Sequence, residues 1–280
     1  MPEEVFFALL SLGFLGVSDF LYKWGQKFEL PRASFLLLQN MAYIPTAIAL
    51  AAYRQELDFS VSLGYGFLNG MLALVATLLF LKSLEHGDSL ALVPVVRLNF
   101  AVTAALTVSF LGEQFNWVKG AALGLAALAI LANGAGYASA ARQRKPFLMA
   151  LIAMILFGCI GLFYKLGLAA GATPAALVVA QSFGAFSLAL PFAIHSGDNI
   201  LVRGAHCWLP LLCGVLVSSS YVALSIAFSY GDAVVVAPIA QLSFVLTGLL
   251  AILFLKEKLH SRKVISIVCA ILSVLVLSNT

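Results

Sequence analysis

Arg97 is the residue with the clearest chemical meaning, because it lies within the long apolar stretch 89–111. An arginine near the middle of a membrane-spanning segment costs at least about 2.5 kcal/mol unless it faces a cavity or a partner. Its planar guanidinium matches the two oxygens of a carboxylate. Arg97 therefore indicates a binding site for an anionic or carboxylate-bearing solute. The alternative is a structural ion pair, or a side chain that reaches the membrane surface.

Asp19 and Lys23 are a second charged pair within an apolar stretch, spaced four residues apart. On a helix this spacing places both side chains on one face. Asp19 and Lys23 are therefore candidates for ion coupling, in which the carboxylate alternates between Lys23 and an incoming proton or other cation. The interpretation that we favour is simpler, namely a local ion pair at the membrane interface.

Uncharged polar side chains and prolines also fall within the apolar stretches. The polar candidates for contact with a solute are Gln39, Asn40, Asn99, Gln181, Tyr221 and Gln241. Side chains of this kind often serve only to hold helices together. Pro94 and Pro238 each remove a helical hydrogen bond, so they are candidate hinges, although ordinary packing kinks explain them nearly as well.

Other chemistry lacks a motif in this sequence. The four cysteines and four histidines do not form a metal-ligand pattern, so we expect no metal and no cofactor. We find no nucleophile elbow, phosphate-binding loop or paired carboxylates, which argues against an enzyme. The net charge of +4 is small and scattered, and this excludes a nucleic-acid-binding surface.

The elements that position these residues are transmembrane helices. The chain is 62% hydrophobic and 10% charged, whereas a soluble domain is roughly half apolar and about a quarter charged. A membrane-spanning helix needs about 20 mostly apolar residues, and its backbone must satisfy its own hydrogen bonds. Ten segments qualify: 5–23, 31–53, 62–81, 89–111, 117–138, 147–168, 173–194, 209–229, 233–255 and 263–278.

The two halves of the chain repeat one another. The segment from Gly16 to Tyr22-Lys23-Trp24-Gly25 recurs 142 residues later, as Gly158 to Tyr164-Lys165-Leu166-Gly167. From Gly87 to Lys119, 11 of 33 positions are identical at an offset of 144. The identities include Gly, Asp, Pro, Glu and Lys, which shared apolar composition could not produce. Arg97 corresponds to Gln241 and Asp19 to Gly161, so the halves differ at the charged positions.

The repeat predicts the domain organisation. We expect an all-α integral membrane protein with a first five-helix repeat at 1–138, a linker loop at 139–146 and a second repeat at 147–280. Five crossings per repeat invert the second copy relative to the first. Inverted repeats with a site between them are typical of secondary transporters that work by alternating access.

The motif from Gly231-Asp232 through Pro238 to Phe254-Leu255-Lys256-Glu257, with its copy from Gly87 to Glu113, resembles the EamA-type members of the drug/metabolite transporter superfamily. The resemblance implies a multi-pass transporter of the cell (inner) membrane that moves a small organic metabolite, with export favoured. Arg97 adds the expectation that the solute is amino-acid-like or anionic. The transporter's partners would be the solute, the bilayer and protons as a candidate coupling ion, and it would act as a monomer or weak homodimer. A flippase for a lipid-linked sugar and a channel-like facilitator remain alternatives.

The side of the membrane that holds the termini has two conflicting indications. Loops after odd-numbered helices carry 12 Lys and Arg residues, and the opposite loops carry 3. Because basic loops favour the cytoplasm, this count predicts that both termini lie outside. The resemblance implies that both lie in the cytoplasm. We favour the count.

Overall fold

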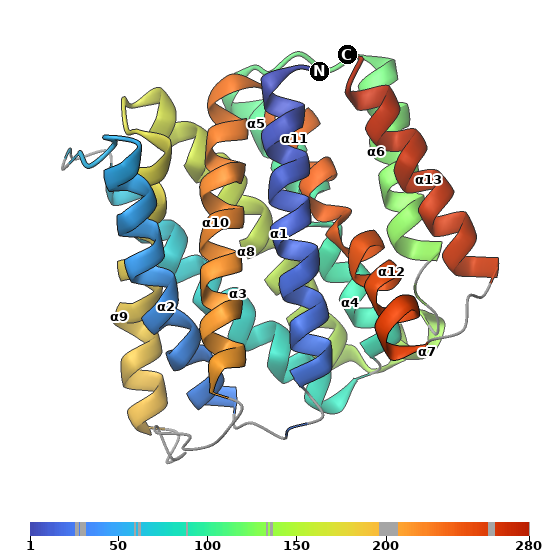
Figure 1. Ribbon diagram of the computed structural model, residues 1–280. Coiled ribbons are helices and arrows are strands. Elements are labelled where there is room, and N and C mark those ends of the chain that lie inside the picture. The colour runs from blue at the N-terminus through green and yellow to red at the C-terminus, as the bar shows by residue number, and fades with distance from the viewer. Residues whose placement is uncertain are drawn as a thin grey trace.

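The chain folds as a bundle of long helices in the computed structural model, which describes residues 1–25, 28, 32–58, 60, 63–87, 89–132, 134, 137–195, 207–256 and 261–279 (Figure 1). The described residues contain no strand. The helices are α1 (Glu3–Gly25), α2 (Arg32–Tyr53), α3 (Leu63–His86), α4 (Ser89–Arg97), α5 (Asn99–Leu111), α6 (Trp117–Ala132), α7 (Tyr137–Arg142), α8 (Arg144–Ala169), α9 (Pro174–His195), α10 (Trp208–Tyr230), α11 (Ala233–Gln241), α12 (Ser243–Leu255) and α13 (Ser261–Leu277). Asp88 and Glu257 of the repeated motif lie outside the described residues.

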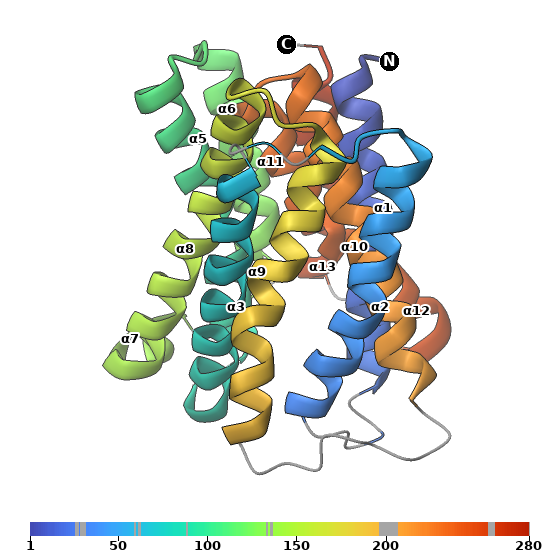
Figure 2. The same ribbon diagram turned by 90° about the vertical axis from the view of Figure 1, so that its left-hand side faces the viewer.

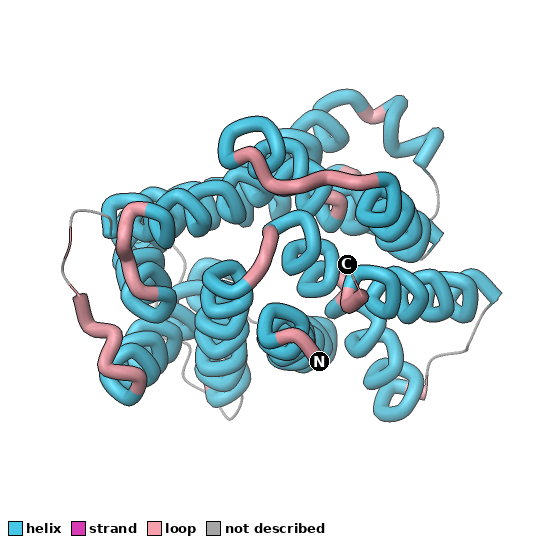
Figure 3. The backbone as a smooth tube through the Cα atoms, turned by 90° about the horizontal axis from the view of Figure 1, so that it is seen from above, coloured by secondary structure: helices cyan, strands magenta, loops and turns pink. Residues whose placement is uncertain are grey.

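The all-helical membrane fold predicted from hydropathy is confirmed, and its helices are compatible with ten spans. Among the described residues, 8 spans are long and apolar enough to cross a membrane. The apolar helix α6 is shorter, at 16 residues, and packs along α13, which has 17. These two complete the ten, and both chain termini lie at the same end of the bundle (Figures 1 and 3).

The structure corrects two details of the predicted elements. The predicted single helices 89–111 and 233–255 are each divided in two, at Leu98 and at Leu242. The segment 139–146 is mostly helical rather than a loop, because it contains the end of α7 and the start of α8. Hydropathy detects the length of a span, but it cannot detect a break of one residue within it.

The two repeats are inverted and interlocked. Helix α1 starts at the end that carries the termini, whereas α8 starts at the opposite end, beside α7 (Figures 1 and 2). Helix α1 packs chiefly on α10, α11 and α12 of the second repeat, and α8 packs on α3, α4 and α5 of the first. Each repeat therefore buries the first helix of the other, so neither half completes its core alone.

Glycines at matching positions allow the closest of these helix contacts. A Cβ atom at Gly70 of α3 would overlap with the backbone carbonyl of Gln181 in α9. A Cβ atom at Gly214 of α10 would overlap with the carbonyl of Gln39 in α2 in the same way. Small residues at helix crossings are what bring backbones together in a membrane, where no hydrophobic force drives one helix toward another.

Gly70→Ala should therefore destabilise the bundle, by about 1–3 kcal/mol, because the added methyl group meets backbone that cannot rotate away. Thermal unfolding of the detergent-purified protein measures this as a lowered Tm. Gly13→Ala in α1 is the matched control, because a Cβ there meets nothing within 4 Å. Equal melting temperatures for the two variants would contradict the assigned contact.

Candidate functional site

Arg97 and Asp19 form an ion pair near the centre of the bundle. Arg97 is the last residue of α4, and its Nη2 contacts Oδ2 of Asp19 in α1. The Arg97 Nη1 donates to Oγ of Ser243, the first residue of α12, at 2.8 Å. The Ser243 hydroxyl in turn donates to Asp19 Oδ2, at 3.3 Å. We call Asp19, Arg97 and Ser243 the central triad.

The central triad lies where the two divided helices meet. At each break the backbone makes a tight turn: the Leu98 N–H donates to the Val95 carbonyl at 3.2 Å, and the Leu242 N–H donates to the Ile239 carbonyl at 3.1 Å. The α4 half-helix ends at Arg97, and the negative end of its dipole favours a cation there. Half-helix ends near the bilayer centre are where transporters of inverted-repeat architecture hold charged substrates.

The prolines precede these breaks by four residues, Pro94 in α4 and Pro238 in α11. Each proline lies within its half-helix rather than at the break itself. Their hinge role remains a prediction. A break four residues after the proline in both repeats is consistent with it.

Packing explains why the second repeat has no acid at the position equivalent to Asp19. The Thr103 hydroxyl donates to the Gly158 carbonyl at 2.8 Å, and Thr247 donates to the Gly16 carbonyl at 2.9 Å, so this feature is shared by both halves. At Gly161, which corresponds to Asp19, a Cβ atom would overlap with the side chain of Thr103. An acid therefore does not fit in the second half, and the ion pair exists once.

The remaining predicted site residues divide into those near the triad and those with local roles. Tyr221 in α10 lies within electrostatic reach of Arg97 and Asp19, and its ring centroid is 6.3 Å from that of Tyr43. Gln241 ends α11, at the position that matches Arg97. Asn99 begins α5, and its Nδ2 donates to the Val96 carbonyl across the break, at 3.1 Å.

Gln39 and Gln181 have equivalent partners in the two repeats, because each accepts a hydrogen bond from a tyrosine in the preceding helix of its own repeat. Gln39 accepts from Tyr22, and Gln181 accepts from Tyr164. Asn40 instead donates to the Leu36 carbonyl of its own helix, at 2.8 Å. Lys23 lies one turn beyond Asp19 on α1, toward the end of that helix.

A second charged group, which the sequence analysis did not single out as a site, lies toward the end of the bundle that carries the termini. Glu113 follows α5, and its carboxylate accepts the backbone N–H groups of Ala233 at 2.8 Å and Val234 at 3.1 Å. Lys165 of α8 places its Nζ 3.3 Å from the same carboxylate. A carboxylate at the start of a helix is stabilised by the exposed N–H groups and the helix dipole.

The neighbouring pair extends this group. Lys119 of α6 forms a 2.8 Å ion pair with Asp232, which directly precedes α11. Lys165 also donates to the backbone carbonyl of Gly231, at 3.0 Å. We call Glu113, Lys165, Lys119 and Asp232 the terminal cluster. It ties the first repeat to the start of α11, so charged contacts connect the two repeats at that end of the bundle.

Ser243 is the member of the central triad that the sequence analysis missed. A serine within an apolar helix is common, so its type carries little signal. Its position carries more, because Ser243 is the repeat equivalent of Asn99 and stands two residues after Gln241.

The comparisons with known proteins agree with this architecture. Inverted repeats with a site between them are typical of secondary transporters of small molecules. The chain belongs to the EamA-like transporter family, whose model matches residues 3–134 and 144–279, one match for each repeat. It is a family of transporters rather than enzymes, which supports the multi-pass membrane protein derived above.

A solved crystal structure, described only as that of a protein, is similar in fold. Its TM-score is 0.80 at 14% sequence identity, and the match covers 98% of this chain and 94% of that chain. The similarity shows a shared fold over nearly the whole of both chains. A comparison with curated proteins finds no match.

Proposed function

We propose that this protein is a secondary transporter of a small amino-acid-like solute, which binds at the central triad. The observation that carries the proposal is the ion pair of Arg97 with Asp19 at the meeting point of the two helix breaks. Both side chains keep 20% of their surface exposed, so the pair is not sealed inside the protein.

The charge of the triad favours a zwitterion. The Arg97–Asp19 pair is neutral as a whole. In a solute that carries both charges, the carboxylate can take the place of Asp19 beside Arg97, and the ammonium group can take the place of Arg97 beside Asp19. Arg97 would bind the carboxylate, and Asp19 would bind the ammonium group. A purely anionic solute would leave the Asp19 carboxylate uncompensated in a poorly solvated site, which is costly.

The same geometry supports proton exchange as the driving force. A proton and the ammonium group of the solute would compete for the Asp19 carboxylate, so the two would not be bound at the same time. Movement of the solute is then linked to movement of a proton in the opposite direction. The alternative drive, facilitated diffusion, requires no change in the charge of Asp19.

The terminal cluster supports alternating access, because its charged contacts between the repeats would hold one end of the bundle closed. By the Lys and Arg count this end faces outside, and the opposite end carries the basic loops. The direction that we propose is export, from the family resemblance.

Counterflow in proteoliposomes tests the proposal. A neutral amino acid should exchange at least about tenfold faster than its decarboxylated amine or its N-acetylated anion, since each lacks one charge-assisted hydrogen bond. An imposed pH gradient should accelerate net flux. Arg54→Gln is the control, because Arg54 pairs with the neighbouring Glu56 in a connecting segment. Equal rates for all three solutes, or no movement of any solute, would refute the proposed substrate class.

A further inference from the structure

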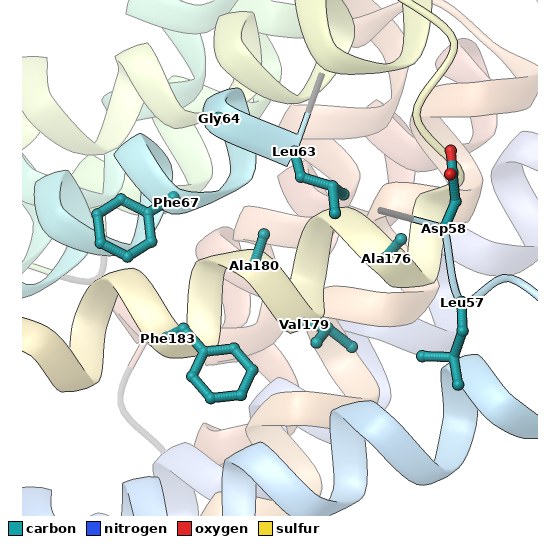
Figure 4. Close-up of a pocket in the computed structure, with 9 residues that line it drawn as sticks. All are labelled: Leu57, Asp58, Leu63, Gly64, Phe67, Ala176, Val179, Ala180 and Phe183. Carbon is teal, nitrogen blue, oxygen red and sulfur yellow. The ribbon is translucent and has the colours of Figure 1, made fainter. Parts of the chain in front are cut away.

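The outer surface of the bundle contains an apolar groove between α3 and α9, and it is separate from the central triad (Figure 4). Its volume is about 310 Å³. The lining residues are Leu57, Asp58, Leu63, Gly64, Phe67, Ala176, Val179, Ala180 and Phe183. Asp58 is the charged residue among them, and it lies at one end of the groove (Figure 4).

The groove follows from the way in which the two helices pack. A Cβ atom at Gly66 would overlap with the Leu177 carbonyl, and one at Gly184 with the Phe67 carbonyl, so the backbones are in close contact. On the outer side of this contact, Ala180 and the other small residues leave a hollow. Phe67 and Phe183 stand on either side of it, 41% and 47% exposed.

The surroundings of the groove are the hydrocarbon of the bilayer. Helices α3 and α9 both contain candidate membrane spans, and they lie side by side at the surface of the bundle (Figure 2). From Ala176 to Phe183 the wall runs roughly 10 Å along α9 at about 1.5 Å per residue. An acyl chain is the molecule that is both apolar and present at high concentration there. An acyl chain that enters the groove leaves one apolar environment for another, so it gains little from the hydrophobic effect. A preference for one lipid must therefore come from packing in the groove and from the headgroup.

The charge at the end of the groove selects the headgroup. Arg54 and Glu56 neutralise one another through a 2.7 Å ion pair. No lysine or arginine pairs with Asp58 within the part of the chain that the structure describes. The net charge of these three residues is therefore −1, which attracts an ammonium group and repels an anionic lipid.

The charged end of the groove is fixed to α9 rather than loosely attached. The Ala175 N–H donates to the Glu56 carboxylate at 2.8 Å, and the Thr173 hydroxyl donates to the Glu56 backbone carbonyl, also at 2.8 Å. The Asp58 N–H donates to that carbonyl as well, at 3.0 Å. Asp58 therefore has a defined place at the surface end of the groove.

We infer that this groove binds one phospholipid with a primary ammonium headgroup, phosphatidylethanolamine being the simplest, with an acyl chain between Phe67 and Phe183 and the ammonium group at Asp58. The site is independent of solute transport, because its occupant comes from the bilayer and is held by other residues than the central triad.

Native mass spectrometry of the full chain in detergent tests the inference. The probes are phosphatidylethanolamine, phosphatidylcholine and phosphatidylglycerol with identical acyl chains. Phosphatidylethanolamine should be retained in preference to both, because phosphatidylcholine shields its charge with methyl groups and phosphatidylglycerol is anionic. Asp58→Asn should weaken its retention about fivefold, the size of an exposed ion pair, and should abolish the preference over phosphatidylglycerol.

A second variant tests the groove itself. Ala180→Trp fills the hollow and should prevent retention of any of the three lipids. Ile155→Trp, on the exposed surface of α8, is the matched control and should bind as the wild type does. Equal retention of the three lipids by the wild type would overturn the inference, and so would retention by Ala180→Trp. A mass of two chains for the wild type that Ala180→Trp reduces to one would also overturn it, because a second copy would then occupy the groove.

Discussion

Arg97→Gln and Asp19→Asn should each destabilise the protein by about 2–3 kcal/mol, whereas the double variant should recover most of that loss. Each single substitution leaves the other member of the ion pair charged and without its partner in a poorly solvated site. Removing both charges leaves two amides that are able to hydrogen-bond to one another and to Ser243. Thermal unfolding in detergent measures all three variants against the wild type.

Transport by the same variants separates a structural role from a functional one. All three should lose counterflow by at least about tenfold, because none retains both charges that we assign to solute binding. Arg54→Gln, which removes an exposed cation, should retain both stability and transport. A double variant that is stable and transports normally would reduce the central triad to a structural ion pair.

Glu113→Ala should open the end of the bundle that carries the termini. The substitution removes the acceptor for the N–H groups of Ala233 and Val234 and leaves Lys165 without its carboxylate. The Glu113 side chain is only 5% exposed, so water replaces these contacts poorly. We expect the closed state to lose about 2 kcal/mol, which is roughly a thirtyfold shift in population.

Distances between spin labels at Gln114 and Tyr230 measure this opening in a cysteine-free background. Both positions are exposed, on the two sides of the terminal cluster. Glu113→Ala and Lys165→Met should lengthen the distance distribution, and Glu113→Gln should do so less, because the amide keeps one acceptor oxygen. Glu3→Gln is the control, since it removes an exposed carboxylate from the start of α1. Unchanged distributions in the first two variants would show that the cluster is not a gate.

The sequence predicted the positions of the membrane spans well, but it did not predict the breaks within two of them. Long apolar stretches locate a helix because the bilayer requires about 20 such residues, whatever the neighbours are. The breaks at Leu98 and Leu242 depend on packing between repeats, and hydropathy contains no information about them. The prolines indicated irregularity in the correct helices, but not its position.

The central triad was partly predictable. Arg97 was identified because a buried cation is costly, and Asp19 because it lacks an equivalent in the second repeat. That they contact one another could not be predicted, because they lie on different helices 78 residues apart and local spacing instead suggested Lys23 as the partner of Asp19. Asn40 was grouped with the site by its residue type alone, yet its amide bonds to its own helix.

The central claim is that Arg97 and Asp19 bind the two charges of one solute. Its most direct test is thermal stabilisation by an amino acid that the wild type exchanges in counterflow, measured on the wild type and on the Asp19→Asn, Arg97→Gln double variant. We predict that the amino acid raises the Tm of the wild type, that its amine and N-acetyl analogues do not, and that the double variant responds to none. A stable double variant that the amino acid stabilises as strongly as the wild type would contradict the claim.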